Sequence, residues 1–354
     1  MRSLDVRRGR IDAQPRGAGP VALTNAIPEE ADDSALDALA ARIGRMHVRQ
    51  RLGLERDLEA LVFHGGRSFR HADTWCSMRG LVRGGLRSVG LLERARRNAR
   101  RIVLRRNEVA LPHLPPAFDG FSLLHLSDLH IDAAPDYAAV LIEAIRALNY
   151  DLCVLSGDYR ARTFGPFEAA LTGLAALRPH LKGTPYAVLG NHDTLRMVPA
   201  MEAMGYRVLL NEWTAIRRNG AAIYLAGIDD PHFYRLVDFH RAADEIPAQA
   251  VSILLSHTPE PYRHAAHAAF DLMLCGHTHG GQICLPNGVP VLTEAGSPRR
   301  FARGAWRYHA MAGYTSTGSG TSLVDVRLNC PPEVTLHTLL RTTPAQRAGE
   351  ADGA

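Results

Sequence analysis

The chain has 354 residues, 46% of them hydrophobic and 22% charged, which excludes a disordered polymer and indicates a globular protein with a substantial core. The formal net charge of +5 is unevenly distributed: residues 1–110 hold 22 arginines against 13 acidic residues, whereas residues 111–354 hold 19 basic against 23 acidic residues. The basic character therefore belongs to the N-terminal part, and anionic partners are expected there.

Cysteine spacing and hydropathy exclude further classes of protein. The five cysteines are widely spaced and include no Cys-x-x-Cys pair, which excludes a disulfide framework and a thiolate zinc site. No run approaches the roughly 18 to 20 apolar residues of a spanning helix, and polar residues follow Arg7 and Arg8 where an export signal needs an apolar stretch. We therefore expect a cytoplasmic protein.

Composition and periodicity divide the chain into four parts. Residues 1–32 are rich in Gly, Pro and Arg without periodicity and are predicted to be disordered. Residues 33–110 are predicted to form a basic, largely helical extension, which begins with the helical spacing of Leu36, Leu39 and Ile43. Residues 111–342 are predicted to be the main folded domain and residues 343–354 a flexible tail.

The segment 79–106 of this extension contains ten arginines and one glutamate, with apolar residues recurring every three or four positions. A helix of this pattern can lie in a membrane interface, with its apolar stripe among acyl chains and its arginines on anionic headgroups. The protein would then be peripheral on the inner face of the membrane. Alternatively, the stripe packs on the next domain and the arginines face water.

After residue 111 the pattern changes to short apolar runs that end in polar, glycine-containing loops. Strands are predicted at 121–127, 151–156, 185–189, 222–228, 251–256 and 271–275 and also at 309–314, 321–326 and 333–340, and helices at 136–148, 166–177 and 197–204. Alternating strands and helices indicate an α/β domain, in which ligand sites lie beyond the carboxyl ends of the strands.

Five of these strands end in residues of a type that binds metals. Asp128 and His130 follow the first strand, and side chains two apart in an extended segment point the same way. The remaining strands end, in chain order, in Asp158, in the run Asn191, His192 and Asp193, in His257, and in the pair His277 and His279. Carboxylates, an amide and imidazoles at five successive strand ends predict a metal site at that edge of the domain.

The ordered motifs Asp-x-His, Gly-Asp, Gly-Asn-His-Asp, His and Gly-His-Thr-His resemble those of the calcineurin-like metallophosphoesterase family, over residues 121 to about 340. Within it, "LSDLHI", "LGNHD" and "CGHTHGGQI" look most like the bacterial subgroup labelled YkuE-like phosphodiesterases. The resemblance implies an α/β fold of the metallophosphoesterase type, a β-sandwich of two mixed sheets flanked by helices, with the basic helical extension at its N-terminus.

The resemblance also implies a dinuclear centre of two divalent ions, for which imidazole and carboxylate ligands suit Mn, Fe or Zn without choosing among them. Seven residues would supply the ligands: Asp128, His130 and His279 for the first ion, Asn191, His257 and His277 for the second, and Asp158 as a bridge. The implied reaction is in-line attack on a phosphodiester or pyrophosphate by a hydroxide that bridges the two ions.

Two further residues of the Gly-Asn-His-Asp motif are candidates for catalysis. In the family, the histidine at the position of His192 assists departure of the leaving group, for which a pKa near neutrality is suitable. Asp193 could orient His192 by a hydrogen bond, or it could cap the helix that follows.

Arginines around the motifs bear on the substrate. Arg160 and Arg162 follow the Gly-Asp motif and could hold a second phosphate of a diester or pyrophosphate, or could serve only the surface. The stretch "SPRRFARGAWR" interleaves arginines with Phe301 and Trp306 and could contact nucleic acid, lipid headgroups or only solvent.

Three functions are compatible with these observations. The first is a metal-dependent phosphohydrolase acting on a lipid-linked substrate such as UDP-diacylglucosamine, because a basic amphipathic segment precedes the main domain. The second is a nuclease or nucleotide phosphodiesterase, which would share the metal site and use the basic surface. The third is a non-catalytic membrane-surface scaffold, which the complete set of ligand and catalytic positions argues against.

Overall fold

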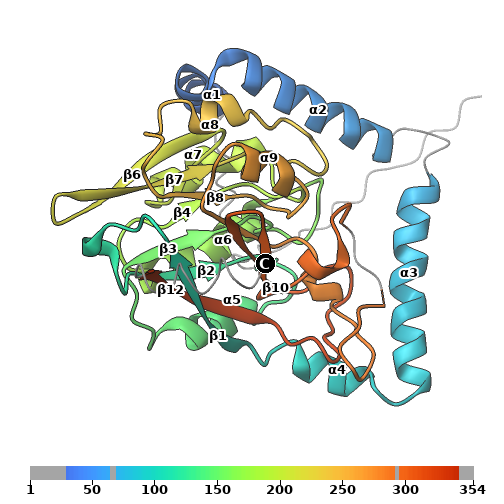
Figure 1. The fold of residues 1–354 in the computed structure, drawn as a ribbon. Helices are drawn as coiled ribbons and strands as arrows, with labels where there is room; N and C mark the ends of the chain where they lie inside the picture. The colour runs from blue at the N-terminus through green and yellow to red at the C-terminus, as the bar shows by residue number, and fades with distance from the viewer. Residues whose placement is uncertain (1–28, 64–68, 292–294, 343–354) are drawn as a thin grey trace, which may run out of the picture.

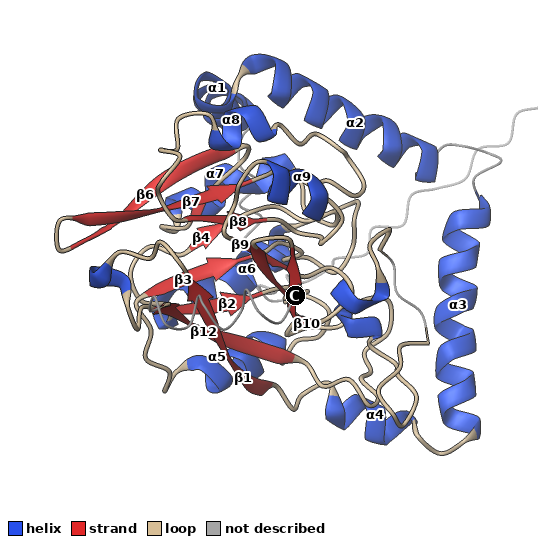
Figure 2. Ribbon diagram, in the orientation of Figure 1, coloured by secondary structure: helices blue, strands red, loops and turns tan. Residues whose placement is uncertain are grey.

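The computed structural model describes residues 29–63, 69–291 and 295–342, and two six-stranded sheets form its centre (Figure 1). Both sheets are mixed, and helices flank them (Figure 2). The predicted α/β sandwich of two mixed sheets is confirmed. The predicted disorder of residues 1–32 and the predicted flexible tail 343–354 lie outside the described residues, except for residues 29–32, which begin a helix.

The first sheet has the strand order β1-β12-β2-β3-β4-β5. Its strands are β1 (Val103–Leu111), β12 (Glu333–Arg341), β2 (Ser122–Leu126), β3 (Leu152–Leu155), β4 (Tyr186–Ala187) and β5 (Arg207–Val208). Strands β2 to β5 are parallel, whereas β12 runs antiparallel to β2 and parallel to β1. The chain thus returns at its C-terminal end to join β1 to the rest of the sheet.

The second sheet has the order β10-β11-β9-β8-β7-β6. Its strands are β10 (Gly304–Tyr308), β11 (Met311–Thr315), β9 (Leu272–Cys275), β8 (Ser252–Leu255), β7 (Ala221–Gly227) and β6 (Glu212–Arg218). The four central strands are parallel, and each edge strand is antiparallel to its neighbour. All residues of β8 and β9 are buried, as expected for central parallel strands covered on both faces.

Apolar clusters fill three layers of the domain. One cluster joins the facing sides of the two sheets, with Leu123 and Val154 from the first sheet and Ile253 and Leu272 from the second. The outer face of the first sheet is covered by α5 (Tyr137–Ile145), α6 (Glu168–Leu177) and α7 (Val198–Ala203), and that of the second sheet by α8 (Phe239–Ala243) and α9 (Tyr262–His267). The core therefore anchors every strand whose end carries a candidate site residue.

The N-terminal helices α1 (Glu29–Ile43) and α2 (Arg45–Phe63) pack on the domain. Leu36, Leu39 and Ile43 of α1 belong to the same apolar cluster as α5, α6 and α7. Helices α3 (Phe69–Ser88) and α4 (Leu92–Asn98) follow, with α3 along one side of the molecule (Figure 1). Among the described residues, no helix has both the length and the apolar character needed to cross a bilayer.

The prediction of one continuous amphipathic helix over residues 79–106 is wrong. Helix α3 ends at Ser88, Gly90 turns the chain with a φ of 70°, and α4 is followed by β1, which pairs with β12. Glycine adopts a positive φ without the clash of a Cβ, and pairing in the sheet then outweighs helical periodicity. The predicted helical extension therefore ends before β1, which belongs to the first sheet.

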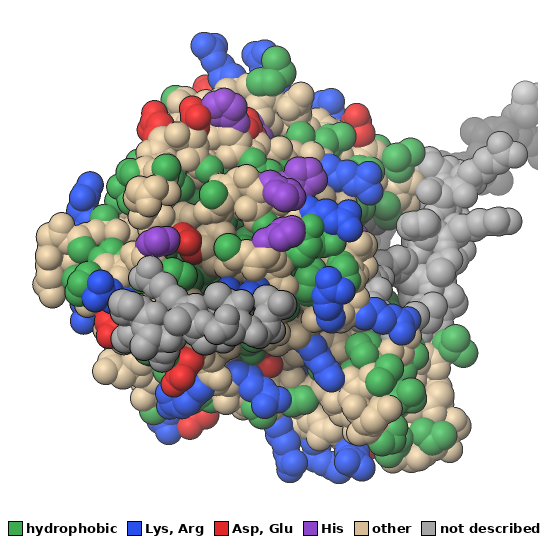
Figure 3. Space-filling view, viewed as in Figure 1, with side chains coloured by type: hydrophobic (Ala, Val, Ile, Leu, Met, Phe, Trp, Pro, Cys, Tyr) green, Lys and Arg blue, Asp and Glu red, His purple; other side chains and the backbone are tan. Residues whose placement is uncertain are grey.

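Most of the apolar stripe of this segment packs inside the protein, whereas Val89 is exposed. Leu86, Leu92 and Ala95 form a cluster with Val324 and Val326, so the stripe meets the main domain as the alternative interpretation required. The stretch 321–326, predicted as a strand, is instead the loop that supplies these two valines. Lys and Arg side chains are spread over the face shown in Figure 3, with a group at its lower edge near α4 and β1.

Candidate metal centre

The candidate site lies where the loops after four buried strands meet the loop after β4, which carries Asn191. Strands β2, β3, β8 and β9 end at Leu126, Leu155, Leu255 and Cys275, and the polar residues singled out above follow within a few positions. Each sheet contributes two of these strands. Both sheets therefore deliver carboxylates and imidazoles to the same end of the sandwich.

The backbone that carries these side chains is bent rather than extended. Five residues have a positive φ in the left-handed region: Asp128 (49°), His130 (38°), Asp158 (59°), His277 (71°) and His279 (51°). Each costs a non-glycine residue about 1 kcal/mol or more, and such strain clusters at functional sites. Asp128 and His130 do converge, but the expected reason is wrong, because the extended segment ends at Leu126 before either residue.

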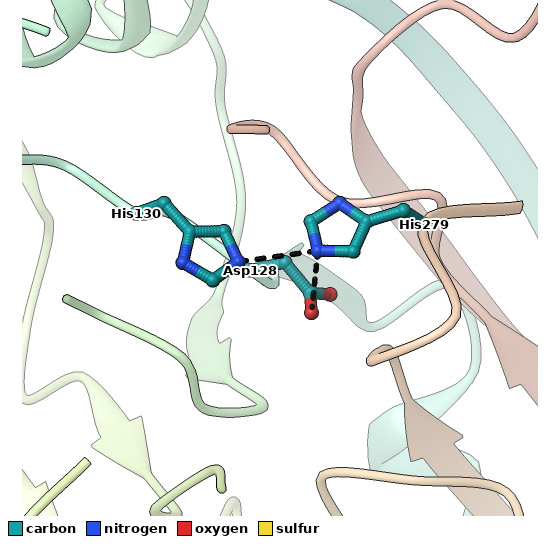
Figure 4. Close-up of side chains that lie close together, drawn as sticks. All are labelled: Asp128, His130 and His279. Atoms are coloured by element: carbon teal, nitrogen blue, oxygen red, sulfur yellow. Dashed lines mark hydrogen bonds and ion pairs between the residues drawn. The ribbon is translucent and has the colours of Figure 1, made fainter. Parts of the chain in front are cut away.

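Asp128, His130 and His279 form the first group (Figure 4). Nε2 of His130 lies 3.1 Å from Nε2 of His279, and this second nitrogen lies 3.6 Å from Oδ1 of Asp128. One ligand atom from each residue lies within 4.8 Å of the others. Two imidazole nitrogens that face each other beside a carboxylate form a set of donors directed at one point.

Asp158, His257 and His277 form the second group, again with ligand atoms within 4.8 Å of one another. Oδ1 of Asn191 lies 2.9 Å from Nε2 of His257, so the amide oxygen faces this group as well. His277 and His279 lie two positions apart in the chain and face different groups. The loop after β9 thus contributes to both.

The carboxylate of Asp158 lies between the two groups. Its Oδ2 is 3.3 Å from Nε2 of His257 in the second group and 3.8 Å from Nε2 of His130 in the first. The other oxygen, Oδ1, accepts a hydrogen bond of 2.9 Å from the main-chain N–H of His192. One carboxylate oxygen is therefore shared by both groups, which is the arrangement that a bridging ligand requires.

Burial and neighbouring charges shift the pKa values of the site in different directions. Burial raises the pKa of Asp128. Burial would also raise the pKa of Asp158, but His257, His192 and His130 together outweigh it and hold that pKa well below its usual value. Burial would lower the pKa of His257, but the carboxylates of Asp158, Asp128 and Asp230 together outweigh it and raise that pKa to about 10. Because a proton and a cation compete for the same nitrogen, metal binding at His257 must release this proton.

Main-chain carbonyl groups orient two of the imidazoles. Nδ1 of His130 lies 2.9 Å from the carbonyl oxygen of Arg160, and Nδ1 of His257 lies 2.8 Å from that of Ser156. A carbonyl oxygen only accepts hydrogen bonds, so Nδ1 carries the proton in the neutral form of each ring. This tautomer leaves the lone pair of Nε2 directed at the centre.

A buried chain of hydrogen bonds supports Asp128 from behind. The hydroxyl of Ser127 donates to Oδ2 of Asp128 at 2.6 Å, the hydroxyl of Ser156 donates to that of Ser127 at 2.7 Å, and Nε2 of His125 lies 2.9 Å from the hydroxyl of Ser156. Burial lowers the pKa of His125 to about 3, so this ring is neutral. The sequence alone does not point to these residues, because a polar residue in or beside a predicted strand carries no signal of its partners.

The carboxylate of Asp193 forms hydrogen bonds with main-chain N–H groups rather than with the ring of His192. It accepts hydrogen bonds of 2.8 Å from the N–H groups of Asp158 and Gly190 and of 2.9 Å from that of Tyr159. It therefore ties the loop after β3 to the loop after β4. The structure shows neither predicted role, since Thr194 caps the helix that follows. Burial raises the pKa of Asp193 to about 6.

His192 lies beside both groups and is almost fully buried. Its Nε2 is 3.9 Å from Oδ2 of Asp158, its Nδ1 is 3.3 Å from the hydroxyl of Thr163, and its ring meets the ring of His130 edge to face with centroids 5.1 Å apart. Burial lowers the pKa of His192, and the charges of Arg160 and Arg79 contribute to this shift. The neutral ring can donate one hydrogen bond toward a group bound at the centre.

The structure separates the two arginines that follow the Gly-Asp motif. The guanidinium of Arg160 is buried and donates to the carbonyl oxygens of His192, Thr163 and, at 2.8 Å, Gly165. It therefore fixes the loop beside His192. Arg162 is exposed and lines a separate cavity.

Two other arginines support the site and were not predicted from the sequence, because no single arginine stands out in a chain that contains so many arginines. Arg327 is fully buried and donates to the carbonyl oxygens of His279 (2.9 Å), Thr317 (2.7 Å) and Gly320 (2.6 Å), which holds the loop of the first group. Arg51 of α2 is also fully buried and donates to the carbonyl oxygen of Asp193 at 3.1 Å. The N-terminal extension thus reaches the loop that carries His192.

Two glycines permit the close approach of the loops. A Cβ on Gly190 would overlap Oδ1 of Asp158, and a Cβ on Gly276 would overlap Oδ2 of Asp128 and the hydroxyl of Ser127. Neither position has room for a side chain, because the carboxylates of the site occupy it. These glycines are therefore required by the site itself and not by a turn.

The aromatic residues of "SPRRFARGAWR" belong to the core. Phe301 is fully buried and stacks on Trp306 with ring centroids 4.6 Å apart, and Trp306 is 8% exposed. Bases of a nucleic acid can stack only on exposed aromatic faces. The contact with nucleic acid that was considered for this stretch is therefore not supported by its aromatic side chains.

The donor atoms that meet at this site fit divalent cations. They are carboxylate oxygens, one amide oxygen and imidazole nitrogens, a set that suits Mn, Fe or Zn. Cys275 ends β9, but its thiol lies 3.3 Å from the hydroxyl of Thr315, and burial raises its pKa to about 12. A thiolate ligand is therefore not part of this donor set.

Comparisons with known proteins agree with this geometry. Residues 121–281 match the model of a family described as calcineurin-like phosphoesterase. The phosphodiesterase YaeI of Escherichia coli is 30% identical over 240 residues, which cover 62% of this chain and 82% of YaeI. The metallophosphoesterases YkoQ and YkuE of Bacillus subtilis are 27% and 28% identical, over 71% and 65% of this chain and 95% and 82% of their own lengths.

Proposed function

The chain belongs to the calcineurin-like metallophosphoesterase family, whose members are hydrolases of phosphoesters, and on that premise we propose that it is a phosphodiesterase working with two divalent metal ions. The observation that carries the proposal is the position of Asp158, one oxygen of which is shared by two groups of ligand residues. A pair of cations needs such a shared anion, since it reduces the repulsion between them.

In this proposal the strand-end residues hold the metals. The ligands are Asp128, His130 and His279 for one ion, Asn191, His257 and His277 for the other, and Asp158 for both. Bound ions would supply activation of water and neutralisation of the charge on the phosphate. The hydrogen bonds from Ser127 and to the carbonyl oxygens of Arg160 and Ser156 keep the ligand side chains oriented before substrate binds.

His192 is the residue that we assign to the leaving group. Its ring borders both groups of ligands without belonging to either, and Arg160 fixes its main chain. The N–H of the imidazole can donate to the oxygen on which negative charge develops as the ester bond breaks. A positioned donor of this kind contributes about 100-fold to 10,000-fold to a rate. Asp193 acts as a positioning residue, because it holds the loop from which His192 projects.

The test compares His192→Ala with Asp158→Ala. His192→Ala should retain two metal ions per chain, measured by mass spectrometry of the bound metal, and lose about 100-fold or more in kcat. Asp158→Ala should lose both metal and activity. Activity is measured with bis(p-nitrophenyl) phosphate and p-nitrophenyl phosphate after resupply of Mn, Fe or Zn. Full activity of either variant would refute the assignment.

The finer proposal is that the substrate is linked to a lipid. A cavity of about 500 Å³ adjoins the loop of His192, and its lining includes the apolar side chains of Leu52, Phe164 and Phe167, four arginines and the two acidic residues Glu55 and Glu59. Apolar walls beside arginines suit an amphiphilic anion. The exposed apolar residues Leu81, on α3, and Val89, just after it, lie among arginines and are candidates for contact with an anionic membrane surface.

Micelles of an anionic detergent test this finer proposal. We expect them to stimulate hydrolysis of an amphiphilic diester and not that of bis(p-nitrophenyl) phosphate. The nuclease alternative predicts instead cleavage of single-stranded DNA with a steep dependence on salt. Cleavage of DNA without stimulation by micelles would favour the nuclease over the enzyme with a lipid-linked substrate. The proposed metal centre would stand in either case.

A further inference from the structure

A basic cavity lies between α3 and the loops of the metal centre. Its volume is about 190 Å³, enough for several water molecules, and three arginines line it: Arg79 and Arg83 from α3 and Arg162 from the loop after β3. These residues come from two parts of the chain about 80 positions apart. The cavity therefore exists only because α3 packs beside the catalytic loops (Figure 1).

Each loop that walls the cavity follows or contacts a residue of the first group of ligands. Asp132 lies two residues after His130, and Arg162 lies two residues after Arg160, whose carbonyl oxygen faces Nδ1 of His130. The third loop, Thr321 to Asp325, follows Gly320, whose N–H donates to the carbonyl oxygen of Asp128 at 2.8 Å. The cavity is therefore adjacent to the metal centre and connected to it by short stretches of chain.

The positive charge of this cavity is only partly balanced from within, because three arginines face two carboxylates, Asp132 and Asp325. Asp325 is engaged by Arg100 and by the hydroxyl of Tyr137, at 2.6 Å, and Oδ1 of Asp132 accepts the N–H of Ala161 at 2.7 Å. Neither carboxylate forms an ion pair with one of the three cavity arginines in the part of the chain that the structure describes.

One atom of the cavity also lacks a protein partner. Nε of Arg79 is buried and has no hydrogen-bond partner among the described residues. A buried donor without a partner is uncommon, since it forfeits its hydrogen bonds to water. A ligand with acceptor oxygens would satisfy it.

We propose that Arg79, Arg83 and Arg162 form a subsite for a phosphate group of the substrate other than the one that is hydrolysed. The inference rests on the proposed phosphodiesterase function and narrows its substrate class to esters with a second phosphate. Arginine suits this task because its planar N–H groups match the oxygens of a phosphate. The metal centre then positions the phosphate that is hydrolysed. The arginines of α3 select substrates that carry a second phosphate.

The experiment measures how much a second phosphate adds to binding. Calorimetry of the metal-loaded full chain gives the Kd of thymidine 5′-phosphate and of thymidine 3′,5′-bisphosphate, which differ by one phosphate. The proteins are the wild type, Arg83→Met, Arg162→Met and the control Arg87→Met, which removes an exposed arginine of α3 outside the cavity. Thermal unfolding checks that each variant is folded.

We expect the wild type and Arg87→Met to bind the bisphosphate about tenfold or more tightly than the monophosphate. The ratio should fall to near one in Arg83→Met and Arg162→Met. A ratio near one in the wild type, or an equal ratio in all four proteins, would overturn the subsite. An equal loss in Arg87→Met would also overturn it, because it would reflect general attraction by the basic helix.

Turnover separates this inference from the function on which it rests. Thymidine 5′-(p-nitrophenyl phosphate) carries no second phosphate, so its hydrolysis tests the metal centre alone. Hydrolysis without any preference for the bisphosphate would remove the subsite and keep the phosphodiesterase. Preferred binding of the bisphosphate, without hydrolysis of the diester by the protein loaded with any of the metals, would refute the proposed function. The cavity would then be an anion-binding site of a protein without this activity.

Discussion

Replacement of Arg51 by methionine should destabilise the whole domain. Arg51 lies in α2 and is fully buried, with Nε 3.3 Å from Oδ2 of Asp229, Nη1 3.2 Å from Oε1 of Glu55 and the guanidinium carbon 3.3 Å from the ring centroid of Tyr234. Asp229 is fully buried too. Methionine fills a similar volume but leaves this carboxylate without its main counter-charge.

The size of the effect follows from burial. Loss of one partner of a buried ion pair costs about 3–5 kcal/mol, and the low end applies here because His47 stays 2.9 Å from Asp229. For a domain of this size, about 3 kcal/mol lowers Tm by about 5 °C. Because Arg51 also donates to the carbonyl oxygen of Asp193, kcat should fall as well.

The assay is thermal unfolding followed by circular dichroism, with urea titration at 25 °C for the free energy. The control is Arg56→Met on the same helix, since Arg56 is 82% exposed and, among the described residues, forms an ion pair only with the exposed Asp57. Its effect should stay within about 0.5 kcal/mol. Equal stability of the two variants would refute the view that α2 is an integral part of the catalytic domain.

Three further predictions concern the site and its surroundings. Gly276→Ala should displace Asp128 and lower metal affinity about tenfold or more, whereas Gly85→Ala, in open space on α3, should leave it unchanged; titration with Mn distinguishes them. The His232–Glu260 pair, 2.9 Å apart, should contribute about 1 kcal/mol. The hydrogen bond to Glu260 raises the pKa of His232 above 6.5. The contribution of His232 to stability is therefore full below pH 6.5 and is lost as pH rises through the pKa that His232 has in the folded protein. Burial would raise the pKa of Glu260, but His232, through its hydrogen bond and charge, and the N–H of Gly296 together outweigh it and hold that pKa below 4.5, so the contribution of Glu260 to stability is lost as pH falls further. Glu260→Gln should therefore lower the free energy of unfolding most between pH 4.5 and 6.5. Urea titrations that show the same loss at every pH from 4 to 8.5 would contradict this prediction. Dialysis against a chelator should abolish hydrolysis, and Mn, Fe or Zn should restore it; activity that survives full removal of metal would contradict the proposed mechanism.

Local sequence was enough to predict the strands and helices that carry the site. The buried runs before Asp128 and His257 are continuous and apolar, and they form β2 and β8 as predicted. Strands β1, β5, β6 and β10 were missed, and β5 has only two residues. β6 and β10 are edge strands with half-exposed, mixed side chains, and β1 became a strand only by pairing with β12, more than 220 residues away.

The sequence by itself determined which residues could bind a metal, because Asp, Asn and His at successive strand ends are rare enough to be specific. The tertiary structure decided which of them face one another, since left-handed backbone at Asp128, Asp158 and His277 aims their side chains. It also decided what the arginines do: Arg51 and Arg160 are buried on carbonyl oxygens and carboxylates, whereas Arg162 lines a cavity with α3. Residue type fixes the chemistry of a side chain, but its partners come from distant parts of the chain, and only packing brings those together.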